Sequence, residues 1–177
     1  MIVGIAGRKG CGKDTLGKMI VDQRGYTQAA FADKLREEVC EIYGCDVQLL
    51  LQRHTKESPM EIFGGKSPRQ VMQDHGTLRR KENPDYWVEA LSERILASPG
   101  ESFVITDVRF PNEKYMIEEM RGIVIKIVRE SWKMFTDVHE SETALDGHTF
   151  DHVVYNKEHY PQGMLVQGQR CLPPVMT

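Results

Sequence analysis

The chain has 177 residues, of which 40% are hydrophobic and 28% are charged, and its formal net charge is −3. This length suits one α/β domain with a continuous core and is short for two domains. The small negative charge argues against general affinity for nucleic acid or an anionic membrane, so any polyanion site must be local. The four cysteines have no zinc-type spacing, and no apolar run approaches a membrane span. These features predict a cytoplasmic protein with reduced thiols.

The strongest motif lies in the first sixteen residues. An apolar run over residues 2–6 leads into a glycine-rich turn, and the apolar spacing after Lys13 predicts a helix. Between such a strand and helix, Gly7-x4-Gly12-Lys13 predicts a phosphate-binding loop, whose backbone N–H groups and lysine face an anion. The usual pattern has Ser or Thr directly after the lysine to hold Mg²⁺. Here Asp14 stands at that place and Thr15 follows, which leaves open which group contacts the metal.

Helices dominate the next part of the chain. A short strand over residues 28–32 is followed by Asp33, the expected N-cap of a helix through Tyr43. Residues 46–66 hold one short helix, capped by Asp46, and a Phe-Gly-Gly turn. Ser67-Pro68 predicts a helix to about residue 75, which leaves Arg79-Arg80 in a loop, and Asn83-Pro84 begins another helix that ends before Pro99-Gly100.

The second half of the chain alternates strands and helices. Strands are predicted at 102–107, 123–128 and 152–155, with a helix from Pro111 between the first two. Residues 129–150 are polar and hold no continuous apolar face. Pro161 and Pro173-Pro174 break the tail, which has no defined element in this prediction. The alternation predicts a three-layer α/β fold with a mostly parallel, five-stranded sheet and helices on both faces.

Two predicted strands end in residues that suit phosphate chemistry. Ligands of an open parallel sheet bind beyond the carboxyl ends of its strands. The first strand ends in the phosphate loop, and the strand before residue 107 ends in Asp107-Val-Arg109. Asp107 can hold Mg²⁺ or merely cap the next turn.

Several arginines lie at predicted element boundaries, where a guanidinium can contact phosphate with two N–H groups. They are Arg69, Arg79, Arg80, Arg109 and Arg129. Together they suggest a site for more phosphate than one nucleoside triphosphate carries. A phosphate acceptor is already nucleophilic at neutral pH, which accounts for the lack of an evident general base. Trp87 lies in an apolar stripe that indicates the core, whereas Trp132 has no such stripe and could stack on a base.

An ordered series of short blocks covers roughly residues 1–157. The blocks are GRKGCGKDT at 7–15, FADKL at 31–35, SPRQVMQDHGT at 67–77, DYW at 85–87, ITDVRFPNE at 105–113 and HESE at 139–142. This series resembles the bacteriophage deoxynucleoside monophosphate kinases. The family transfers the γ-phosphoryl group of ATP to a deoxynucleoside monophosphate with Mg²⁺, on a phosphate-loop kinase fold similar to adenylate kinase.

The resemblance implies a single kinase domain over residues 1–177, with a helical substrate-binding insertion at about 34–98 and a mobile lid at about 129–150. It implies catalytic roles for Lys13, Asp107, Arg109 and Arg129 and a metal site at Thr15 and Asp107. The implied ATP-binding residues are Lys9, Gly10, Cys11, Gly12, Lys13, Asp14, Thr15, Asn156 and Lys157. The implied monophosphate-binding residues are Asp33, Lys34, Arg69, Gln73, Arg79 and Trp87. The expected location is the cytoplasm, of the host if the chain is phage-encoded.

Two other functions stay open at this point. A dephospho-coenzyme A kinase-like enzyme would phosphorylate a hydroxyl group, with Asp33 as the general base. A non-catalytic nucleotide-binding regulatory module would bind ATP to organise a partner surface. The sequence leaves undecided which bases are accepted, whether ribonucleotides are excluded and whether the protein forms a homodimer. It indicates no direct binding to nucleic acid or membrane.

Overall fold

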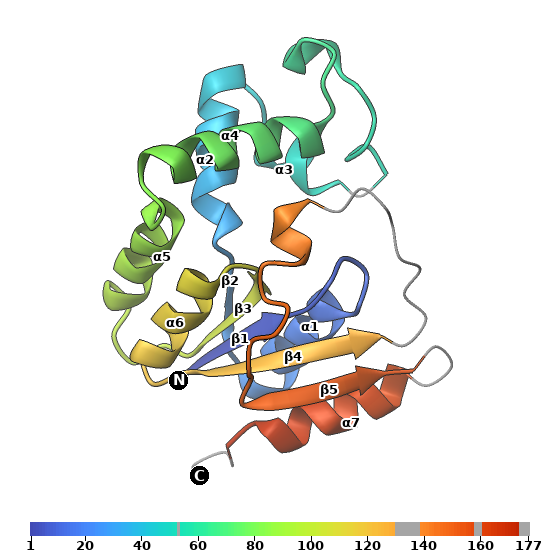
Figure 1. The fold of residues 1–177 in the computed structure, drawn as a ribbon, viewed down its shortest axis with the longest axis vertical. Coiled ribbons are helices and arrows are strands. Elements are labelled where there is room, and N and C mark those ends of the chain that lie inside the picture. Colours follow the sequence, from blue (N-terminus) through green and yellow to red (C-terminus); the bar gives the residue numbers. More distant parts are fainter. Residues whose placement is uncertain (53, 130–138, 158–160, 174–177) are drawn as a thin grey trace. The chain divides into compact units, whose positions relative to one another are not determined.

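The computed structural model describes residues 1–52, 54–129, 139–157 and 161–173 (Figure 1). These residues form two compact units. Unit 1 contains Met1–Ala30 and Arg94–Thr177, and unit 2 contains Phe31–Glu93. Residues 130–138 of the predicted lid, including Trp132, lie outside the described residues.

Unit 1 is built on a five-stranded sheet in the order β2-β3-β1-β4-β5. The strands are β1 (Ile2–Ala6), β2 (Thr27–Ala29), β3 (Phe103–Val108), β4 (Ile123–Arg129) and β5 (His152–Asn156). All four neighbouring pairs are parallel, which confirms the predicted α/β sheet. Because β1 has a neighbour on each side, its carboxyl end, where the glycine-rich loop begins, lies at the centre of the sheet.

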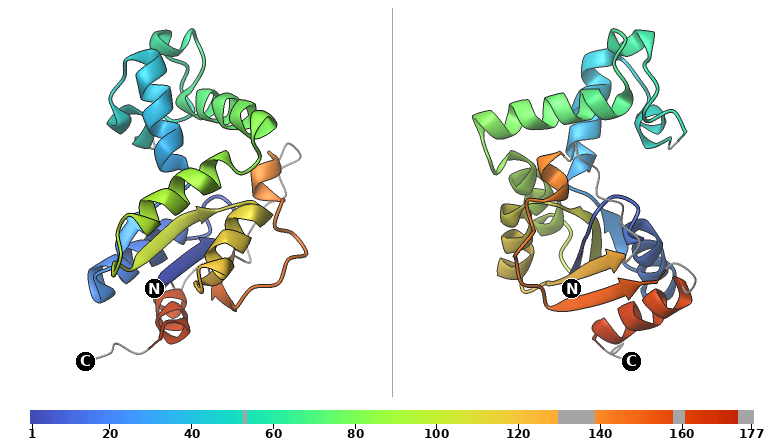
Figure 2. Two further views of the ribbon diagram at one scale, coloured as in Figure 1. Left: turned by 90° about the vertical axis from the view of Figure 1, so that its left-hand side faces the viewer. Right: turned by 45° about the vertical axis from the view of Figure 1, so that its right-hand side comes forward.

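Helices cover both faces of this sheet (Figure 2). They are α1 (Lys13–Arg24) and α7 (Pro161–Cys171) on one face and α6 (Pro111–Glu119) on the other. The side chains of Ile5, Leu16 and Met164 share one buried cluster, which places α1 and α7 together. Gly4 faces the opposite side, because a Cβ there would lie 2.6 Å from the Ile117 side chain of α6. This alternation along β1 is the two-residue period of a strand that is buried on both faces.

The register between β1 and β3 slips beside the loop. Gly4 pairs with Ile105 and Ala6 pairs with Val108, so β3 has one extra residue in this interval. Thr106 faces α1, since a Cβ on Gly17 would lie 2.3 Å from its Cγ2 atom, yet Val108 contacts the Gly4 side. The bulge therefore changes which face the side chains of β3 point to, and Asp107 lies within it. Bulges of this kind re-aim side chains and are common next to active sites.

Unit 2 is helical. It holds α2 (Ala32–Tyr43), α3 (Val47–Leu51), a 3₁₀ turn η1 (Glu61–Phe63), α4 (Pro68–Glu82) and most of α5 (Tyr86–Leu96). The predicted caps are present at Asp46, which accepts from the Gln48 N–H at 2.7 Å, and at Ser67, which forms a capping box with Gln70. Buried Phe63 packs edge-on against the ring of Tyr43, with 5.1 Å between the centroids.

Three local predictions are wrong. Asp33 is not an N-cap, because α2 already begins at Ala32. The Asp33 carboxylate instead accepts from Arg36 at 2.7 Å. Helix α4 continues to Glu82, so Arg79 and Arg80 lie in its last turns and not in a loop. Pro161 does not break the tail but begins α7. Proline is well tolerated in a first helical turn because the N–H that it lacks has no partner there.

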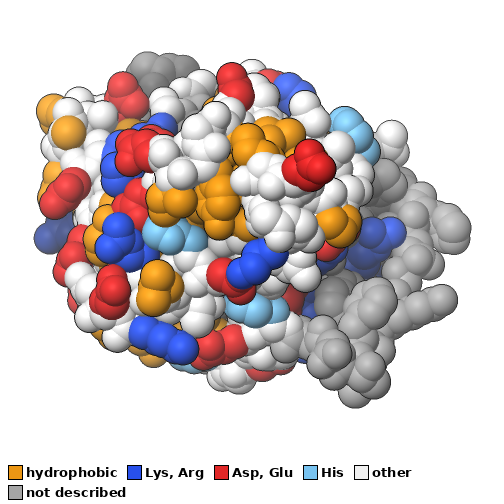
Figure 3. Space-filling model, turned by 90° about the horizontal axis from the view of Figure 1, so that it is seen from above, with side chains coloured by type: hydrophobic (Ala, Val, Ile, Leu, Met, Phe, Trp, Pro, Cys, Tyr) orange, Lys and Arg blue, Asp and Glu red, His pale blue; other side chains and the backbone are white. Residues whose placement is uncertain are grey.

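The surface carries no extended basic face on the side drawn in Figure 3, where acidic, basic and apolar side chains of the described residues are intermixed. None of the helices in the described ranges has the length and apolar character needed to cross a bilayer.

Candidate active site

The glycine-rich loop after β1 depends on two crowded glycines. Gly7 has φ 144°, and a Cβ there would lie 2.7 Å from both the Cys11 Sγ atom and the Ile127 carbonyl oxygen. Gly12 has φ 113°, and a Cβ there would lie 2.8 Å from the Met164 Sδ atom. At Gly7 both the backbone angle and the fixed Ile127 carbonyl group exclude a larger residue, whereas at Gly12 the backbone angle is the main constraint. The sequence motif thus encodes the close contact of the loop with β4 and α7.

Lys13, the first residue of α1, has a buried side chain that is folded over the loop. Its Nζ atom donates to the carbonyl oxygens of Gly7 at 2.5 Å and Arg8 at 2.9 Å. Burial lowers the pKa of the ammonium from its usual value, and the nearby Arg109 lowers it further. An incoming phosphate would reverse this shift, because an opposite charge favours the ammonium form. A bound anion would therefore stabilise the charged form of Lys13, which burial now disfavours.

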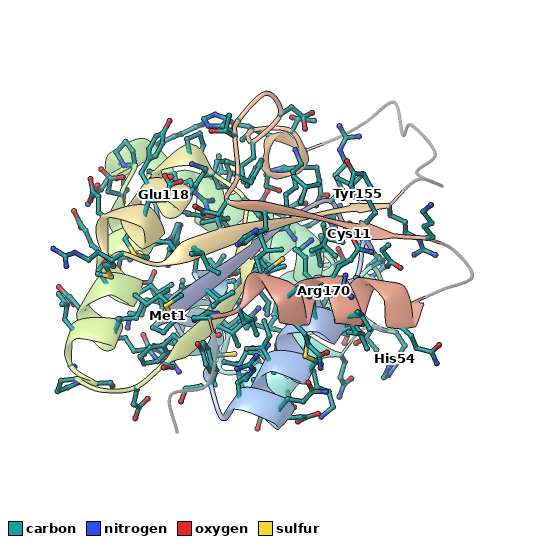
Figure 4. The ribbon with its side chains drawn as sticks, turned by 90° about the horizontal axis from the view of Figure 1, so that it is seen from below. Met1, Cys11, His54, Glu118, Tyr155 and Arg170 are labelled. Atoms are coloured by element: carbon teal, nitrogen blue, oxygen red, sulfur yellow. The ribbon has the colours of Figure 1, made fainter. Side chains whose placement is uncertain are left out.

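Contacts from β4 and β5 fix the loop from outside. The Asn156 side chain at the end of β5 donates to the Cys11 carbonyl oxygen at 2.7 Å. Arg129 at the end of β4 donates to the Gly10 carbonyl oxygen at 3.0 Å. Figure 4 places Cys11, in the loop after β1, on the same side as Tyr155, near the carboxyl end of β5, with Met1 at the opposite end of β1. The loop is thus held in a defined conformation by the strands beside it.

The described part of the predicted lid, residues 139–150, contacts the same loop through Glu142 and Asp146. The Glu142 carboxylate, in the 3₁₀ turn η2 (Glu140–Glu142), accepts from the Lys9 backbone N–H at 2.6 Å and from Arg109 Nη1 at 2.5 Å. Arg8 pairs with Asp146 at 2.9 Å. Burial alone would raise the pKa of Glu142, but Arg109 and the Lys9 N–H outweigh it, so its pKa lies below the usual value. Glu142 is therefore held as an anion among the cations of the loop.

A cavity of about 310 Å³ lies beside the loop. It is lined by the loop, by the ends of β3 and β4 and by residues 141–150, and four of its lining side chains are cationic: Arg8, Arg109, Lys126 and Arg129. The Nε atom of Arg129 is buried and has no hydrogen-bond partner among the described residues. Because a buried guanidinium donor is costly to leave unpaired, an anion bound here would satisfy it.

Thr15 and Asp107 offer oxygen ligands near the loop. Thr15 lies exposed in the first turn of α1, and Asp107 is half-buried in the bulge of β3, which pairs with β1 directly before the loop. A hydroxyl and a carboxylate suit Mg²⁺, which usually takes one or two protein oxygens together with phosphate oxygens and water. The donor set therefore fits the predicted ion. Asp14 is exposed beside Thr15.

The residues predicted to bind the monophosphate all lie in unit 2. Lys34 pairs with Glu37 at 3.4 Å, and Arg69, near the start of α4, pairs with Glu57 at 2.7 Å. Gln73 follows one turn after Arg69 on α4 and is half-buried. Figures 1 and 2 show α4 and α2 as the long helices of this unit.

Trp87 is only 2% exposed and donates to the Gly76 carbonyl oxygen at 3.4 Å, so it belongs to the core of unit 2, as its apolar stripe indicates. Its place near the monophosphate stays a prediction.

A buried carboxylate that the sequence analysis missed organises unit 2. Glu38 of α2 has a side chain that is 8% exposed and accepts from His75 Nε2 at 2.8 Å, from Arg79 Nε at 3.1 Å and from the Tyr86 hydroxyl. Burial alone would raise the pKa of Glu38, but these three donors lower it below the usual value. The sequence does carry a sign that Glu38 is buried: this acidic residue lies between Leu35 and Val39 on the apolar face of the helix. Arg79 thus has an internal partner.

Replacement of Glu38 by glutamine is expected to lower the free energy of unfolding by about 1–3 kcal/mol, because Arg79 and His75 lose a charged acceptor. The folded-state pKa of Glu38 lies below its unfolded value, so this stabilisation is present above about pH 4.3 and is lost as the pH falls through the folded-state pKa. Thermal melts between about pH 3 and pH 7, values that bracket the usual glutamate pKa, should show the difference from wild type shrinking in acid. Glu37→Gln, at an exposed position, is the matched control; an equal loss in both variants would contradict the assignment.

Comparison with known proteins identifies the family. A family model described as deoxynucleotide monophosphate kinase matches residues 47–162. This chain belongs to that family. It is 30% identical over 173 residues to a protein of Acanthamoeba polyphaga mimivirus whose name assigns it provisionally to the deoxynucleotide monophosphate kinases, with 89% of each chain covered. It is 23% identical over 224 aligned positions to the deoxynucleoside-5′-monophosphate kinase of Escherichia phage T5, with 89% of this chain and 90% of that protein covered.

The fold is also found among solved structures. TT1252 from Thermus thermophilus superposes with a TM-score of 0.51 at 16% identity, over 96% of this chain and 94% of that one. Identity at this level supports the fold alone, and it agrees with the parallel sheet described above. This member of the deoxynucleotide monophosphate kinase family therefore has an α/β scaffold with the glycine-rich loop at the carboxyl end of the central strand.

Proposed function

We propose that this kinase transfers the γ-phosphoryl group of ATP to the phosphate of a deoxynucleoside 5′-monophosphate, giving ADP and the deoxynucleoside diphosphate. The bond between the γ-phosphorus and the bridging oxygen of ATP breaks, and a bond from the γ-phosphorus to an oxygen of the acceptor phosphate forms. The observation that carries this proposal is the family membership, together with a phosphate loop whose lysine is buried against it. Such reactions depend on positioning and charge stabilisation more than on a general base.

In unit 1, we assign the ATP phosphates to the loop N–H groups of residues 9–15 and to Lys13. Arg109 and Arg129 line the cavity beside the loop and would stabilise the charge on the transferred group. The unpaired Nε atom of Arg129 supports this assignment. Asn156 and Lys157 border the adenine in this proposal, although Asn156 also holds the Cys11 carbonyl group.

Magnesium is part of the same proposal. Thr15 and Asp107 would hold it, and a bound Mg²⁺ would neutralise charge that develops on the β- and γ-phosphate oxygens. The role of the protein is to present one hydroxyl and one carboxylate on rigid elements, the first turn of α1 and the bulge of β3.

In unit 2, we assign the monophosphate to Asp33, Lys34, Arg69, Gln73, Arg79 and Trp87. Arg69 and Gln73 are four residues apart on α4 and share one side of the helix. Arg79 and Trp87 also contact the Glu38 network or the core, so they would act partly by shaping the site. The Asp33 carboxylate is paired with Arg36, which favours a binding role over the general base that a hydroxyl acceptor would need.

A coupled ADP assay with ATP and each of the four deoxynucleoside monophosphates tests the function. Turnover with at least one of them is expected, at the rates of about 1–100 s⁻¹ typical of kinases. A parallel panel of ribonucleoside monophosphates and a nucleoside-linked alcohol shows which acceptor is used. ADP formation with the alcohol alone would favour the dephospho-coenzyme A kinase-like reaction, and tight ATP binding with no turnover would favour a regulatory module.

A further inference from the structure

The Glu142 carboxylate joins the backbone of the phosphate loop to the Arg109 side chain. Its Oε2 atom accepts from the Lys9 N–H at 2.6 Å and its Oε1 atom accepts from Arg109 Nη1 at 2.5 Å. The side chain is 9% exposed, and Arg109 is 30% exposed. Charge-assisted bonds of this length in a partly buried site are strong and directional.

Arg109 is fixed on its other side by a second carboxylate. Glu113, 2% exposed near the start of α6, accepts from the backbone N–H of Arg109 at 2.7 Å and of Phe110 at 3.0 Å. Glu113 therefore sets the backbone at this position, and Glu142 sets the guanidinium. With both in place, the Arg109 side chain lines the cavity beside the loop.

Resting on the function proposed above, we infer that Glu142 is a positioning residue: it holds the Arg109 guanidinium in the geometry that the transferred phosphate requires, and through the Lys9 N–H it anchors this arrangement to the loop backbone. A long arginine side chain has much rotamer freedom to lose, and a fixed partner removes this cost before the phosphate arrives. An alternative is that Glu142 only competes with ATP phosphates for the Lys9 N–H. The two possibilities predict opposite effects of removing its charge.

Steady-state kinetics of Glu142→Gln, Arg109→Ala and the double variant test the inference. A glutamine at this position would keep the size and one acceptor oxygen but lose the charge that holds Arg109. We expect kcat to fall about 10- to 100-fold in E142Q, the scale of a small misplacement of catalytic groups, with a much smaller change in KM for ATP. In the Arg109→Ala background, E142Q should change kcat little further, because the group that Glu142 positions is already gone.

The control is Glu140→Gln, an exposed glutamate in the same 3₁₀ turn, which should leave kcat unchanged. Unchanged kcat with a lower KM for ATP in E142Q would overturn the inference in favour of a competing anion. An equal loss of kcat in both backgrounds would also overturn it. If E142Q folds poorly, Glu142→Asp keeps the charge on a side chain too short to reach both partners, and wild-type kcat in that variant would contradict the inference.

Two measurements separate this inference from the proposed function. Wild-type enzyme and E140Q must turn over a deoxynucleoside monophosphate, and a lack of turnover in both would contradict the function itself. Independently of activity, hydrogen exchange of the Lys9 amide should be slow in wild type and faster in Glu142→Ala. Equal exchange in the two proteins would show that Glu142 does not hold the loop.

Discussion

Replacement of Lys13 by methionine is expected to lower kcat by about 10²- to 10³-fold, the usual cost of removing one group that stabilises transition-state charge. Lys13 is 8% exposed and its ammonium lies at the loop, where a phosphate oxygen can replace one of the two loop carbonyl groups that it contacts. Methionine has a similar length and packs in apolar surroundings. The expected loss is therefore catalytic. Stopped assays of ADP formation, with a thermal melt of the same preparation, check both parts of this prediction.

The matched control for this variant is Lys18→Met on the same helix. The Lys18 side chain is 76% exposed and pairs only weakly with Asp22, at 3.1 Å, as an exposed i,i+4 pair. Lys18→Met should keep wild-type kcat and stability. If Lys13→Met retained kcat within about threefold of wild type, far less than the expected loss, the assignment of Lys13 to the ATP phosphates would be wrong.

Local sequence signals predicted much of this fold. The apolar run 2–6, the two crowded glycines and the apolar spacing of α1 are features of adjacent residues, and the strand, loop and helix were confirmed. Caps at Asp46 and Ser67 were likewise confirmed, because each side chain accepts from a backbone N–H no more than three residues further along the chain. The ends of the helices were predicted less accurately than the helices themselves. Moving the start of α2 by one residue near Asp33 changes the stability of the helix only a little.

Local sequence patterns could not predict contacts between residues that are far apart in the chain. Glu142 meets Lys9 across more than 130 positions, and no period or motif in the chain specifies that pairing. The effect of Pro161 depends on whether it lies inside a helix or in its first turn, and the residue type alone does not distinguish these positions. The buried Glu38 had a visible signal, a charge on an apolar face, but its three partners come from α4 and α5.

Replacement of Asp107 by asparagine is the second change expected to have a large effect, with kcat about 10²-fold lower and a higher Mg²⁺ concentration needed for saturation. Asparagine keeps the shape of the side chain, so the register slip between β1 and β3 should persist and the loss would come from the charge. Titration of Mg²⁺ in the kinetic assay, and calorimetry of ATP binding at several Mg²⁺ concentrations, measure the two effects separately. Chelation with EDTA should abolish turnover of the wild-type enzyme.

The control for Asp107→Asn is Asp22→Asn, an exposed carboxylate on α1 whose side chain is 54% exposed. If Asp107 only capped the turn before α6, asparagine would replace it well, since both residues make the same local hydrogen bonds. Unchanged Mg²⁺ dependence would then accompany unchanged kcat. The bulge argues for the opposite outcome: it switches the facing of β3 between Thr106 and Val108, directly beside the phosphate loop. A simple turn cap has no need of that irregularity, whereas the bulge would aim a carboxylate at a metal ion that bound phosphates share.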